Sequence, residues 1–385
     1  MQTRSNNIKV GIDLSPIAFR SRAPGTAVLV EKQARALLAM NLEWKWVLVA
    51  TPRVLIDTPF FATLAPIVVP DAPLSYHIPC RLGRVWQNAG CSLGLATAFF
   101  APLFGPPVVT NYFDANAYHP VRDTRDARSR LKWIFIRRLW KRSRRRSRVL
   151  FILSEYGRTR MVEADPASAS KWVVAPCGAP QPSARPATDP PWAKQLRGRP
   201  FILYAGAFSE NKNQRRLIEA WDEMRRRHPA FPALVLIGPA PASYLHEVIE
   251  PARSRTAYPA EIIIPGFVPA EEVAWAFHAA RAYVQPSFAE GFGMPVIEAM
   301  SYGLPVACSD STSLPEVAGG AAVLFDPASV ASIAIALEKI ALDETERARL
   351  RQAGHVRAKA FTWERNARIV AGRIREELAL IQAGY

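Results

Sequence analysis

The stretch 283–303, YVQPSFAEGFGMPVIEAMSYG, brings together residue types that could bind a phosphate. An apolar run at 281–285 predicts a short buried strand, and a glycine-bearing loop follows at 289–293. Met294-Pro295 then begins a helical pattern, because proline suits a first helical turn, where its missing N–H costs no hydrogen bond. Strand, glycine loop and helix together present backbone N–H groups and a positive helix end at the carboxyl edge of a parallel sheet, where phosphates bind.

Two carboxylates flank this loop. Glu290 lies on its leading side, and Glu298 follows eight residues later, about one turn into the predicted helix. Because a phosphate repels a carboxylate, these side chains are better suited to accept hydrogen bonds from ribose or sugar hydroxyls. The alternative is that Glu298 merely favours the helix N-terminus and that Glu290 is a solvated loop residue. Both interpretations stay open on these two residues alone.

The segment Glu-Gly-Phe-Gly-Met-Pro-x-x-Glu-Ala at 290–299 resembles the E-x7-E signature of retaining glycosyltransferases of family 4. The likeness covers residues 200–365 continuously and the amino-terminal half more loosely. It implies an α/β protein with the GT-B fold: two facing Rossmann-like domains with doubly wound parallel sheets and a deep interdomain cleft. The other matching segments are 204–206, 212–213, 234–238, 265–268, 303–306, 313–319, 324–327 and 361–364.

The resemblance also implies roles for individual residues. Glu290 would position the transferred sugar, Lys212 would contact the diphosphate of a nucleotide-sugar donor, and Glu298 would bind the ribose hydroxyls; Glu290 and Lys212 are the expected catalytic residues. Asn211 stands where relatives often carry a second cation, which weakens the expected diphosphate clamp. The remaining residues expected to bind this substrate are Gly206, Gly266, Phe267, Gly291, Phe292, Gly293, Met294 and Pro295.

We expect neither a metal ion nor a cofactor. The chain contains no D-x-D triplet, and its four cysteines and six histidines do not cluster. In the resembling family, side chains and helix dipoles neutralise the diphosphate, and the nucleotide sugar is itself a substrate.

The amino-terminal half offers weaker candidates. In the family, glycines in the first loop approach the donor phosphate or the acceptor, so Gly25 and Thr26 are acceptor-side candidates, although a plain turn explains them equally well. Asn111 begins the segment Asn-Tyr-Phe-Asp, where many relatives carry a His-Asp pair. The histidine is missing, which removes support for a catalytic role copied from it. Asp114 remains an acceptor-side candidate, with an exposed loop carboxylate as the alternative.

The length of 385 residues suggests two domains. Alternating strand and helix patterns predict a first domain at 1–178 and a second domain at 201–362. The resemblance implies that the first domain binds the acceptor and the second binds the nucleotide sugar. Between them, 179–200 is rich in proline and polar residues and is predicted as a linker. A long amphipathic helix at 363–385 is expected to cross back to the first domain.

The sequence predicts a cytoplasmic location. Asp13 interrupts the first apolar run too early for a secretory signal, and the cysteines are therefore expected to be reduced. Residues 89–109 carry no charge, but their prolines and glycines argue against a membrane-spanning helix.

The net charge of +16 is concentrated in Arg122–Arg148, which holds 13 Lys or Arg and only two Asp. Tryptophans and aliphatic residues interleave with the cations, as in a helix lying on an anionic membrane. We expect core packing together with a membrane-facing basic surface, and hence a peripheral position on the inner face of the cytoplasmic membrane. The alternatives are a core face alone, an anionic acceptor and nucleic acid; no nucleic-acid motif accompanies the charge.

The favoured hypothesis is a metal-independent, retaining glycosyltransferase of bacterial cell-surface polysaccharide synthesis. The resemblance suggests mannose from GDP-mannose first, and a glycan or lipid-linked glycan as acceptor. The alternatives are a nucleotide-sugar epimerase or another enzyme of this fold, and a basic non-catalytic module that binds membrane or nucleic acid. Lys212 together with Glu290 and Glu298 separates these classes, because a binding module has no need of the three together.

Overall fold

A computed structural model describes residues 8–19, 24–73, 77–113 and 127–385. The chain forms two compact units: Met1–Gly178 with Thr362–Tyr385, and Ala179–Phe361. The proline-rich segment 179–200, predicted as a linker, falls within the second unit in this division. Part of it is a short 3₁₀ helix, Pro191–Leu196, whose Trp192 is buried against Phe201 and Trp275.

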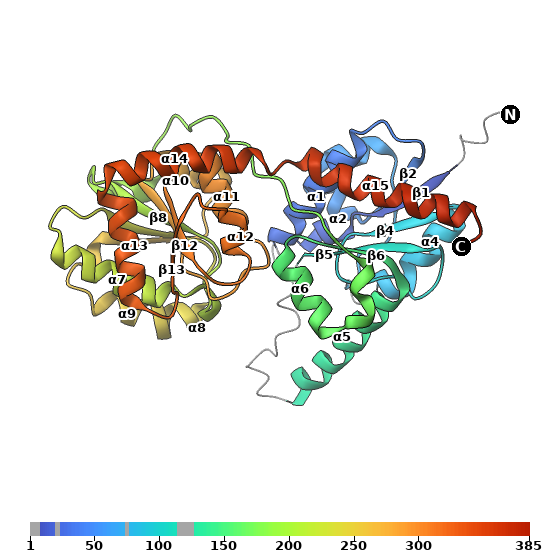
Figure 1. Cartoon of the computed structure of the whole chain (residues 1–385), viewed down its shortest axis with the longest axis horizontal. Helices are drawn as coiled ribbons and strands as arrows, with labels where there is room; N and C mark the ends of the chain where they lie inside the picture. The colour runs from blue at the N-terminus through green and yellow to red at the C-terminus, as the bar shows by residue number, and fades with distance from the viewer. Residues whose placement is uncertain (1–7, 20–23, 74–76, 114–126) are drawn as a thin grey trace. The chain divides into compact units, whose positions relative to one another are not determined.

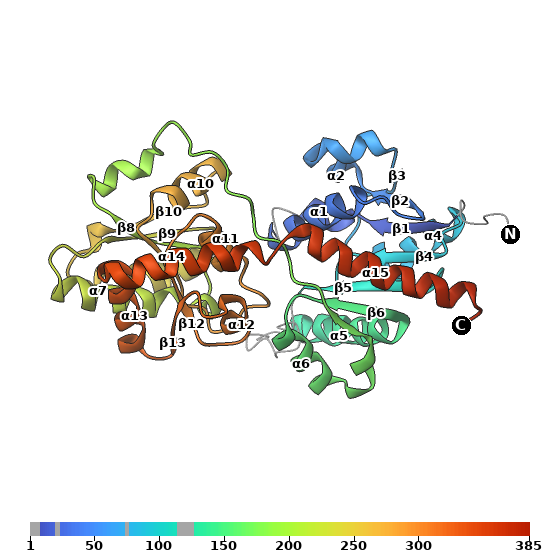
Figure 2. The same cartoon turned by 45° about the horizontal axis from the view of Figure 1, so that its top comes forward.

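The first unit is built on a parallel sheet of seven strands in the order β3-β2-β1-β4-β5-β6-β7 (Figure 2). This is the strand order of a doubly wound sheet, which places ligands at the carboxyl ends of its strands. The strands are β1 (Lys9–Asp13), β2 (Lys45–Ala50), β3 (Ile67–Val68), β4 (Leu93–Ala96), β5 (Val108–Tyr112), β6 (Ser147–Ile152) and β7 (Trp172–Val174).

Helices cover both faces of this sheet (Figure 1). On one face, α1 (Pro24–Leu38) lies beside α15 (Trp363–Gln382). On the other face, α4 (Gly83–Asn88) and α5 (Ala127–Arg146) pack around the buried Trp86 and Trp140. The other helices in the described part of this unit are α2 (Pro52–Asp57), α6 (Glu155–Ala164) and the short η1 (Ser15–Phe19), η2 (Pro59–Leu64), η3 (Ile78–Leu82) and η5 (Pro166–Lys171).

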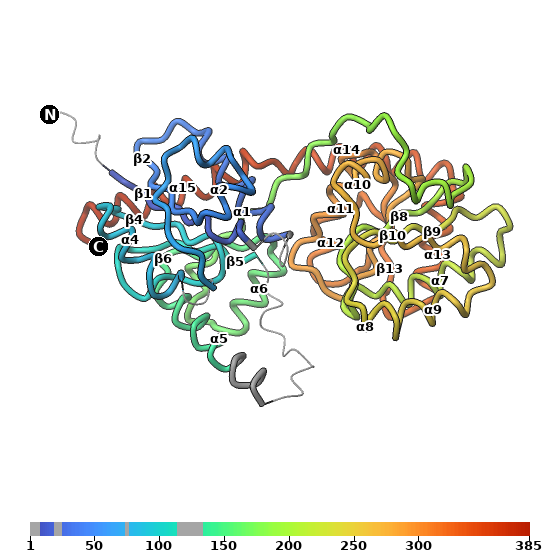
Figure 3. The backbone as a smooth tube through the Cα atoms, turned by 180° about the vertical axis from the view of Figure 1, so that it is seen from behind, coloured from blue at the N-terminus to red at the C-terminus, as the bar shows by residue number. Residues whose placement is uncertain are grey.

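The second unit repeats the plan with six parallel strands in the order β10-β9-β8-β11-β12-β13. Helices α7 and α13 pack into one core cluster, and Figures 1 and 3 show α10 and α14 on the opposite side of the sheet from α7 and α9. The strands are β8 (Phe201–Ala205), β9 (Ala233–Ile237), β10 (Ile262–Gly266), β11 (Ala282–Gln285), β12 (Val306–Ser309) and β13 (Val323–Phe325). The helices are α7 (Gln214–Arg227), α8 (Ala242–Tyr244), α9 (Glu250–Ser254), α10 (Ala270–Ala279), α11 (Met294–Ser301), α12 (Leu314–Ala318), α13 (Val330–Leu342) and α14 (Glu344–Lys359), with the short η7 (Glu210–Lys212), η8 (Leu245–Ile249) and η9 (Pro259–Glu261).

The fold corrects one boundary that bears on the candidate site. The sequence predicted a loop up to Thr26, but α1 begins at Pro24, so Gly25 and Thr26 lie in its first turn. Proline at the start of a helix explains the earlier beginning. No helix in the described ranges combines the length and hydropathy needed to cross a membrane.

Candidate functional site

The loop between β11 and α11 has the predicted form of strand, glycine turn and helix. Gly293 caps α11 with a φ of 101°, in the left-handed region that favours glycine. A Cβ atom there would lie 2.5 Å from Leu314 Cδ2, so a larger residue would also require the buried Leu314 side chain to move. Pro295 lies in the first turn of α11, as predicted. The first N–H groups of this helix therefore point at the carboxyl edge of the sheet.

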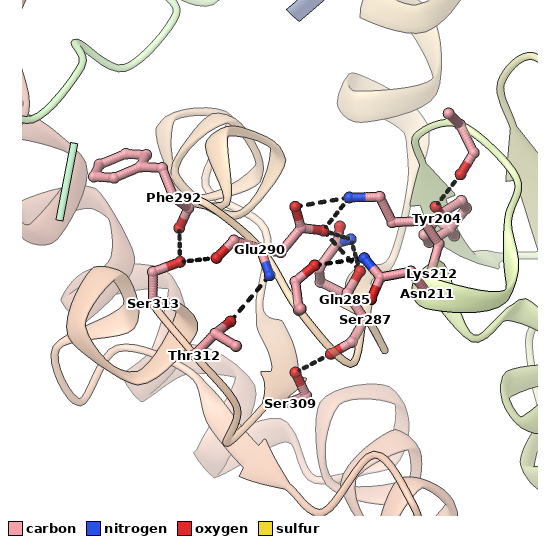
Figure 4. A network of polar contacts seen from close by, with 12 residues as sticks. Tyr204, Asn211, Lys212, Gln285, Ser287, Glu290, Phe292, Ser309, Thr312 and Ser313 are labelled. Carbon is pink, nitrogen blue, oxygen red and sulfur yellow. Dashed lines mark hydrogen bonds and ion pairs between the residues drawn. The ribbon is translucent and has the colours of Figure 1, made fainter. Parts of the chain in front are cut away.

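Glu290 and Lys212 form an ion pair at this edge (Figure 4). Lys212 Nζ lies 2.7 Å from each carboxylate oxygen. Gln285 Nε2 and Ser287 Oγ also donate to Glu290 Oε1, at 2.9 and 2.7 Å. Four hydrogen bonds thus fix the Glu290 carboxylate in one orientation, whereas a solvated loop residue would be free to rotate.

Residues distant in the sequence hold the backbone of the same loop (Figure 4). The Glu290 N–H donates to Thr312 Oγ1 at 3.0 Å, and Ser313 Oγ donates to the carbonyls of Glu290 and Phe292 at 2.9 and 3.0 Å. Asn211 Nδ2 donates to the Ala289 carbonyl at 2.8 Å. Asn211, which stands in place of a second cation, is therefore a support for the loop.

Lys212 is positioned by its neighbour in the chain. Asn213 has a φ of 60° and is buried, and its Nδ2 donates to the carbonyls of Pro286 and Pro327 at 3.0 and 2.8 Å. These bonds tie η7 to the end of β11 and bring Lys212 to Glu290. Of the nearby arginines, Arg215 pairs with Glu219 at 3.8 Å, and Arg216 lies over the ring of Phe288.

Glu298 is set apart from this network. It lies in α11 and is partly buried, and burial raises the pKa of its carboxyl to about 7. No hydrogen-bond or ion-pair partner of this carboxylate is found among the described residues. A partly buried carboxylate without a protein partner is suited to accept hydrogen bonds from hydroxyls of a ligand.

Three further candidates stand at the carboxyl ends of β8 and β10, which lie on either side of β9 in the sheet. Gly206 follows β8, Gly266 ends β10 with a φ of 80°, and the side chain of Phe267 is 77% exposed. Gly291, Met294 and Pro295 are partly buried. Phe292 differs from these, because its ring is buried edge-to-face against Phe361, so only its backbone is available to a ligand.

Of the candidates in the first unit, the structure describes Gly25 and Thr26. Gly25 is exposed and Thr26 is partly buried in the first turn of α1, and Asp114 lies outside the described residues. Asn111, at the place of the missing histidine, is buried and donates to Gln33 Oε1 at 2.5 Å, so it has a structural contact. No group of His, Cys, Asp or Glu suited to hold a metal occurs within the described ranges.

Residues that sequence reasoning missed are Gln285, Ser287, Thr312 and Ser313. Gln285 and Ser287 stood in the central stretch, and their polar type at the end of an apolar strand was an available signal. Ser313 stands in the family-like segment 313–319, but neither it nor Thr312 carried a signal of a contact with Glu290, because both reach that residue from more than 20 positions away in the sequence.

Residues 191–357 match a family model described as glycosyl transferases group 1. O-antigen chain mannosyltransferase B of Escherichia coli is 37% identical over 174 residues, which is 44% of each chain. Serotype-specific mannosyltransferase WbdA of Escherichia coli is 30% identical over 173 residues, covering 44% of this chain and 21% of the relative. The match thus spans less than half the length of these curated relatives.

Two solved structures resemble the whole chain. Sucrose-phosphate synthase of Thermosynechococcus elongatus has a TM-score of 0.71 at 18% identity, covering 97% of this chain and all of that one. Anabaena HepE in complex with UDP and glucose has a TM-score of 0.70 at 16% identity, covering 96% of this chain and 100% of that one. At these identities the likeness concerns the fold, which is GT-B, as the two doubly wound sheets indicate.

Proposed function

We propose that this chain transfers a sugar from a nucleotide sugar to a glycan or lipid-linked glycan, because residues 191–357 match the model of group 1 glycosyl transferases and the chain has the GT-B fold. Mannose from GDP-mannose is the first choice, since the relatives at 30–37% identity are named as O-antigen or serotype-specific mannosyltransferases. Synthesis of a bacterial cell-surface polysaccharide is the corresponding role. The observation that carries the proposal is the Lys212–Glu290 pair at the sheet edge where α11, the helix that contains Glu298, begins.

The geometry suggests how the second unit would handle the nucleotide sugar. An ammonium group has three N–H donors, and Glu290 uses two of those of Lys212, which leaves one for a phosphate oxygen. Negative charge develops on the departing diphosphate, and Lys212 with the positive end of α11 would stabilise it without a metal ion. Glu290, held rigidly, would orient the sugar ring, and Glu298 would accept hydrogen bonds from the ribose.

We further propose retention of the anomeric configuration. The tasks proposed for the two carboxylates do not require a covalent intermediate: Glu290 is hydrogen-bonded to Lys212, and Glu298 would bind the ribose. Attack by the acceptor on the same face as the leaving diphosphate would then allow a phosphate oxygen to take the acceptor proton.

A peripheral position on an anionic membrane is part of the proposal. In α5, Ile134 and Phe135 are 49% and 56% exposed, and the neighbouring Arg138 and Lys141 are exposed as well. The tryptophan at position 140 is instead buried and stacks on Phe100, so that side of the helix belongs to the core. Exposed apolar side chains beside cations suit an anionic lipid surface, where each cation adds about 1 kcal/mol.

Nucleotide-sugar binding tests the proposal directly. GDP-, UDP-, ADP- and dTDP-linked sugars would be compared by thermal shift, with and without added Mg²⁺. We expect GDP-mannose to raise the melting temperature without Mg²⁺, and Glu298→Gln to lose this response. Glu247→Gln, an exposed glutamate in η8, is the matched control and should keep it.

Product analysis separates the enzyme classes. With GDP-mannose and a mannoside acceptor, a transferase forms a new glycosidic bond, whose anomeric configuration NMR reports. An epimerase changes the nucleotide sugar without any acceptor. Stabilisation by none of the nucleotides would contradict the proposed function.

A further inference from the structure

A buried polar cluster lies at the carboxyl edge of the first sheet, outside the site described above. Three adjacent strands, β2, β1 and β4, end there in polar residues: Thr51 follows β2, Asp13 ends β1, and Thr97 follows β4. Thr97 Oγ1 donates to the Asp13 carbonyl at 2.6 Å, and Asp13 Oδ1 accepts from the Ser15 N–H at 3.0 Å. These bonds hold the strand ends together.

An imidazole faces the carboxylate of this cluster. His77 Nε2 lies 3.9 Å from Asp13 Oδ1, which is beyond hydrogen-bond distance, and both side chains are at most 1% exposed. Among the described residues, neither ring nitrogen of His77 has a hydrogen-bond partner, and Asp13 Oδ2 has none. Burial raises the pKa of Asp13 above its usual value, and the nearby His77 partly offsets this effect.

Two buried hydroxyls are further polar groups without a hydrogen-bond partner in the described part of the chain. They belong to Ser15 and Thr51, which are 2% and 3% exposed. Thr51 occupies the N-cap position of α2, where threonine usually accepts from a backbone N–H, yet its side chain makes no such bond. Leaving a buried polar group unpaired costs about 1–3 kcal/mol, so several in one place call for an explanation.

We propose that Asp13, Ser15, Thr51 and His77 form a binding site for hydroxyl groups of the acceptor sugar. The inference rests on the proposed glycosyl transfer, for which it supplies the second substrate's site. A carboxylate accepts hydrogen bonds, while an imidazole and two hydroxyls both donate and accept, which matches neighbouring hydroxyls of a pyranose. The carboxyl ends of parallel strands are where α/β sheets bind ligands.

The chemistry of the cluster disfavours other ligands. A phosphate would be repelled by Asp13. The four residues contain one carboxylate and one imidazole, and no metal-binding group was found among the described residues. Because the four side chains are nearly inaccessible, a sugar hydroxyl would reach them through a local opening of this edge.

Removing the two hydroxyls tests whether they bind a sugar or are simply unpaired groups in the folded chain. Thr51→Val and Ser15→Ala delete unpaired hydroxyls with little loss of volume, so both should leave the melting temperature of the full chain unchanged or raise it. If the hydroxyls bind a sugar, the same variants should weaken binding of methyl α-mannoside and mannobiose, measured by ligand-observed NMR, by about two- to tenfold each. Thr58→Val is the matched control, because Thr58 is also buried and unpaired but lies beyond the other end of α2.

The outcomes separate this inference from the proposed function. Binding of GDP-mannose should be unchanged in Thr51→Val and Ser15→Ala, since the residues proposed to bind it belong to the second unit. The inference is overturned if both variants bind the two mannosides as the wild type does, or if the wild type binds neither mannoside while it binds GDP-mannose. Mannoside binding that these variants weaken, together with no nucleotide binding, would instead contradict only the proposed nucleotide-sugar site.

Discussion

At the scale of single residues, two glutamates eight positions apart have opposite surroundings. Glu290 receives hydrogen bonds from Lys212, Gln285 and Ser287, and is thereby fixed and compensated in charge. Glu298 lacks such partners among the described residues, and burial raises its pKa to about 7. A glutamate is therefore suited to orient a sugar ring at position 290 and to accept hydrogen bonds from ligand hydroxyls at position 298.

The raised pKa of Glu298 makes stability depend on pH in a defined direction. Its folded pKa of about 7 lies above the ordinary value of 4.5, so the native state binds more protons than the unfolded state between these values. The contribution of Glu298 to the free energy of unfolding should therefore be largest below pH 4.5, and it should be lost as pH rises through about 7. At 1.36 kcal/mol per pKa unit, the loss is at most about 3 kcal/mol.

Glu298→Gln removes this titration, and urea unfolding between pH 4 and 8 measures the effect. We expect the variant to be more stable than the wild type at pH 8 and equal to it near pH 4. Glu247→Gln should follow the wild type throughout. Parallel profiles for Glu298→Gln and the wild type would show that the Glu298 carboxyl is not perturbed.

At the scale of elements, the unit of β11, loop and α11 could be predicted because its signals are local. Gly293 and Pro295 mark the turn and the helix start, and the apolar run before them marks the strand. The segment 52–68 yielded no prediction, since α2, η2 and β3 are short and without a clear period. The contacts of Thr312 and Ser313 could not be predicted for another reason: they depend on how the strands are ordered in the sheet, which no local sequence pattern indicates.

Gly293→Ala tests whether the turn before α11 requires glycine for two reasons. The variant should lose about 1 kcal/mol for its left-handed backbone, and more because its Cβ would lie 2.5 Å from Leu314 Cδ2. Gly303 is the matched control: its φ is 73°, but nothing lies within 4 Å of an added Cβ. Urea unfolding should therefore show a larger loss for Gly293→Ala than for Gly303→Ala. Equal losses would exclude the contact with Leu314 as a constraint.

Variants of α5 should show which of its side chains contact a membrane and which pack in the core. Replacing exposed Ile134 and Phe135 together by serine should leave the melting temperature unchanged, and should weaken co-sedimentation with vesicles containing phosphatidylglycerol. Trp140→Ala should instead cost about 3–5 kcal/mol of stability, because that ring is buried against Phe99 and Phe100. Vesicle binding by the double variant equal to that of the wild type would remove Ile134 and Phe135 from the proposed contact.

At the scale of the whole molecule, the sequence indicated two strand-helix domains, and the structure shows which residues tie the last helix to the first unit. Gln33 of α1 accepts from Asn111 of β5 at 2.5 Å and donates to Asn366 of α15 at 2.9 Å. Asn366 in turn donates to the carbonyls of Ala175 and Pro176. All three amide side chains are buried, so this chain of bonds is shielded from water. Amphipathic periodicity could predict α15, but it could not predict these partners.

The division into units predicts that Ala179–Phe361 binds the nucleotide sugar by itself. Lys212, Glu290 and Glu298, and every residue that hydrogen-bonds to the Glu290 carboxylate, belong to this unit, which has its own core around Trp221. A fragment of residues 179–361 should therefore fold and bind GDP-mannose with a Kd within about threefold of the full chain, measured by calorimetry, while transferring no sugar. A folded fragment with no affinity for GDP-mannose would mean that the first unit contributes to nucleotide-sugar binding. A fragment that binds and also transfers would refute an acceptor site in the first unit.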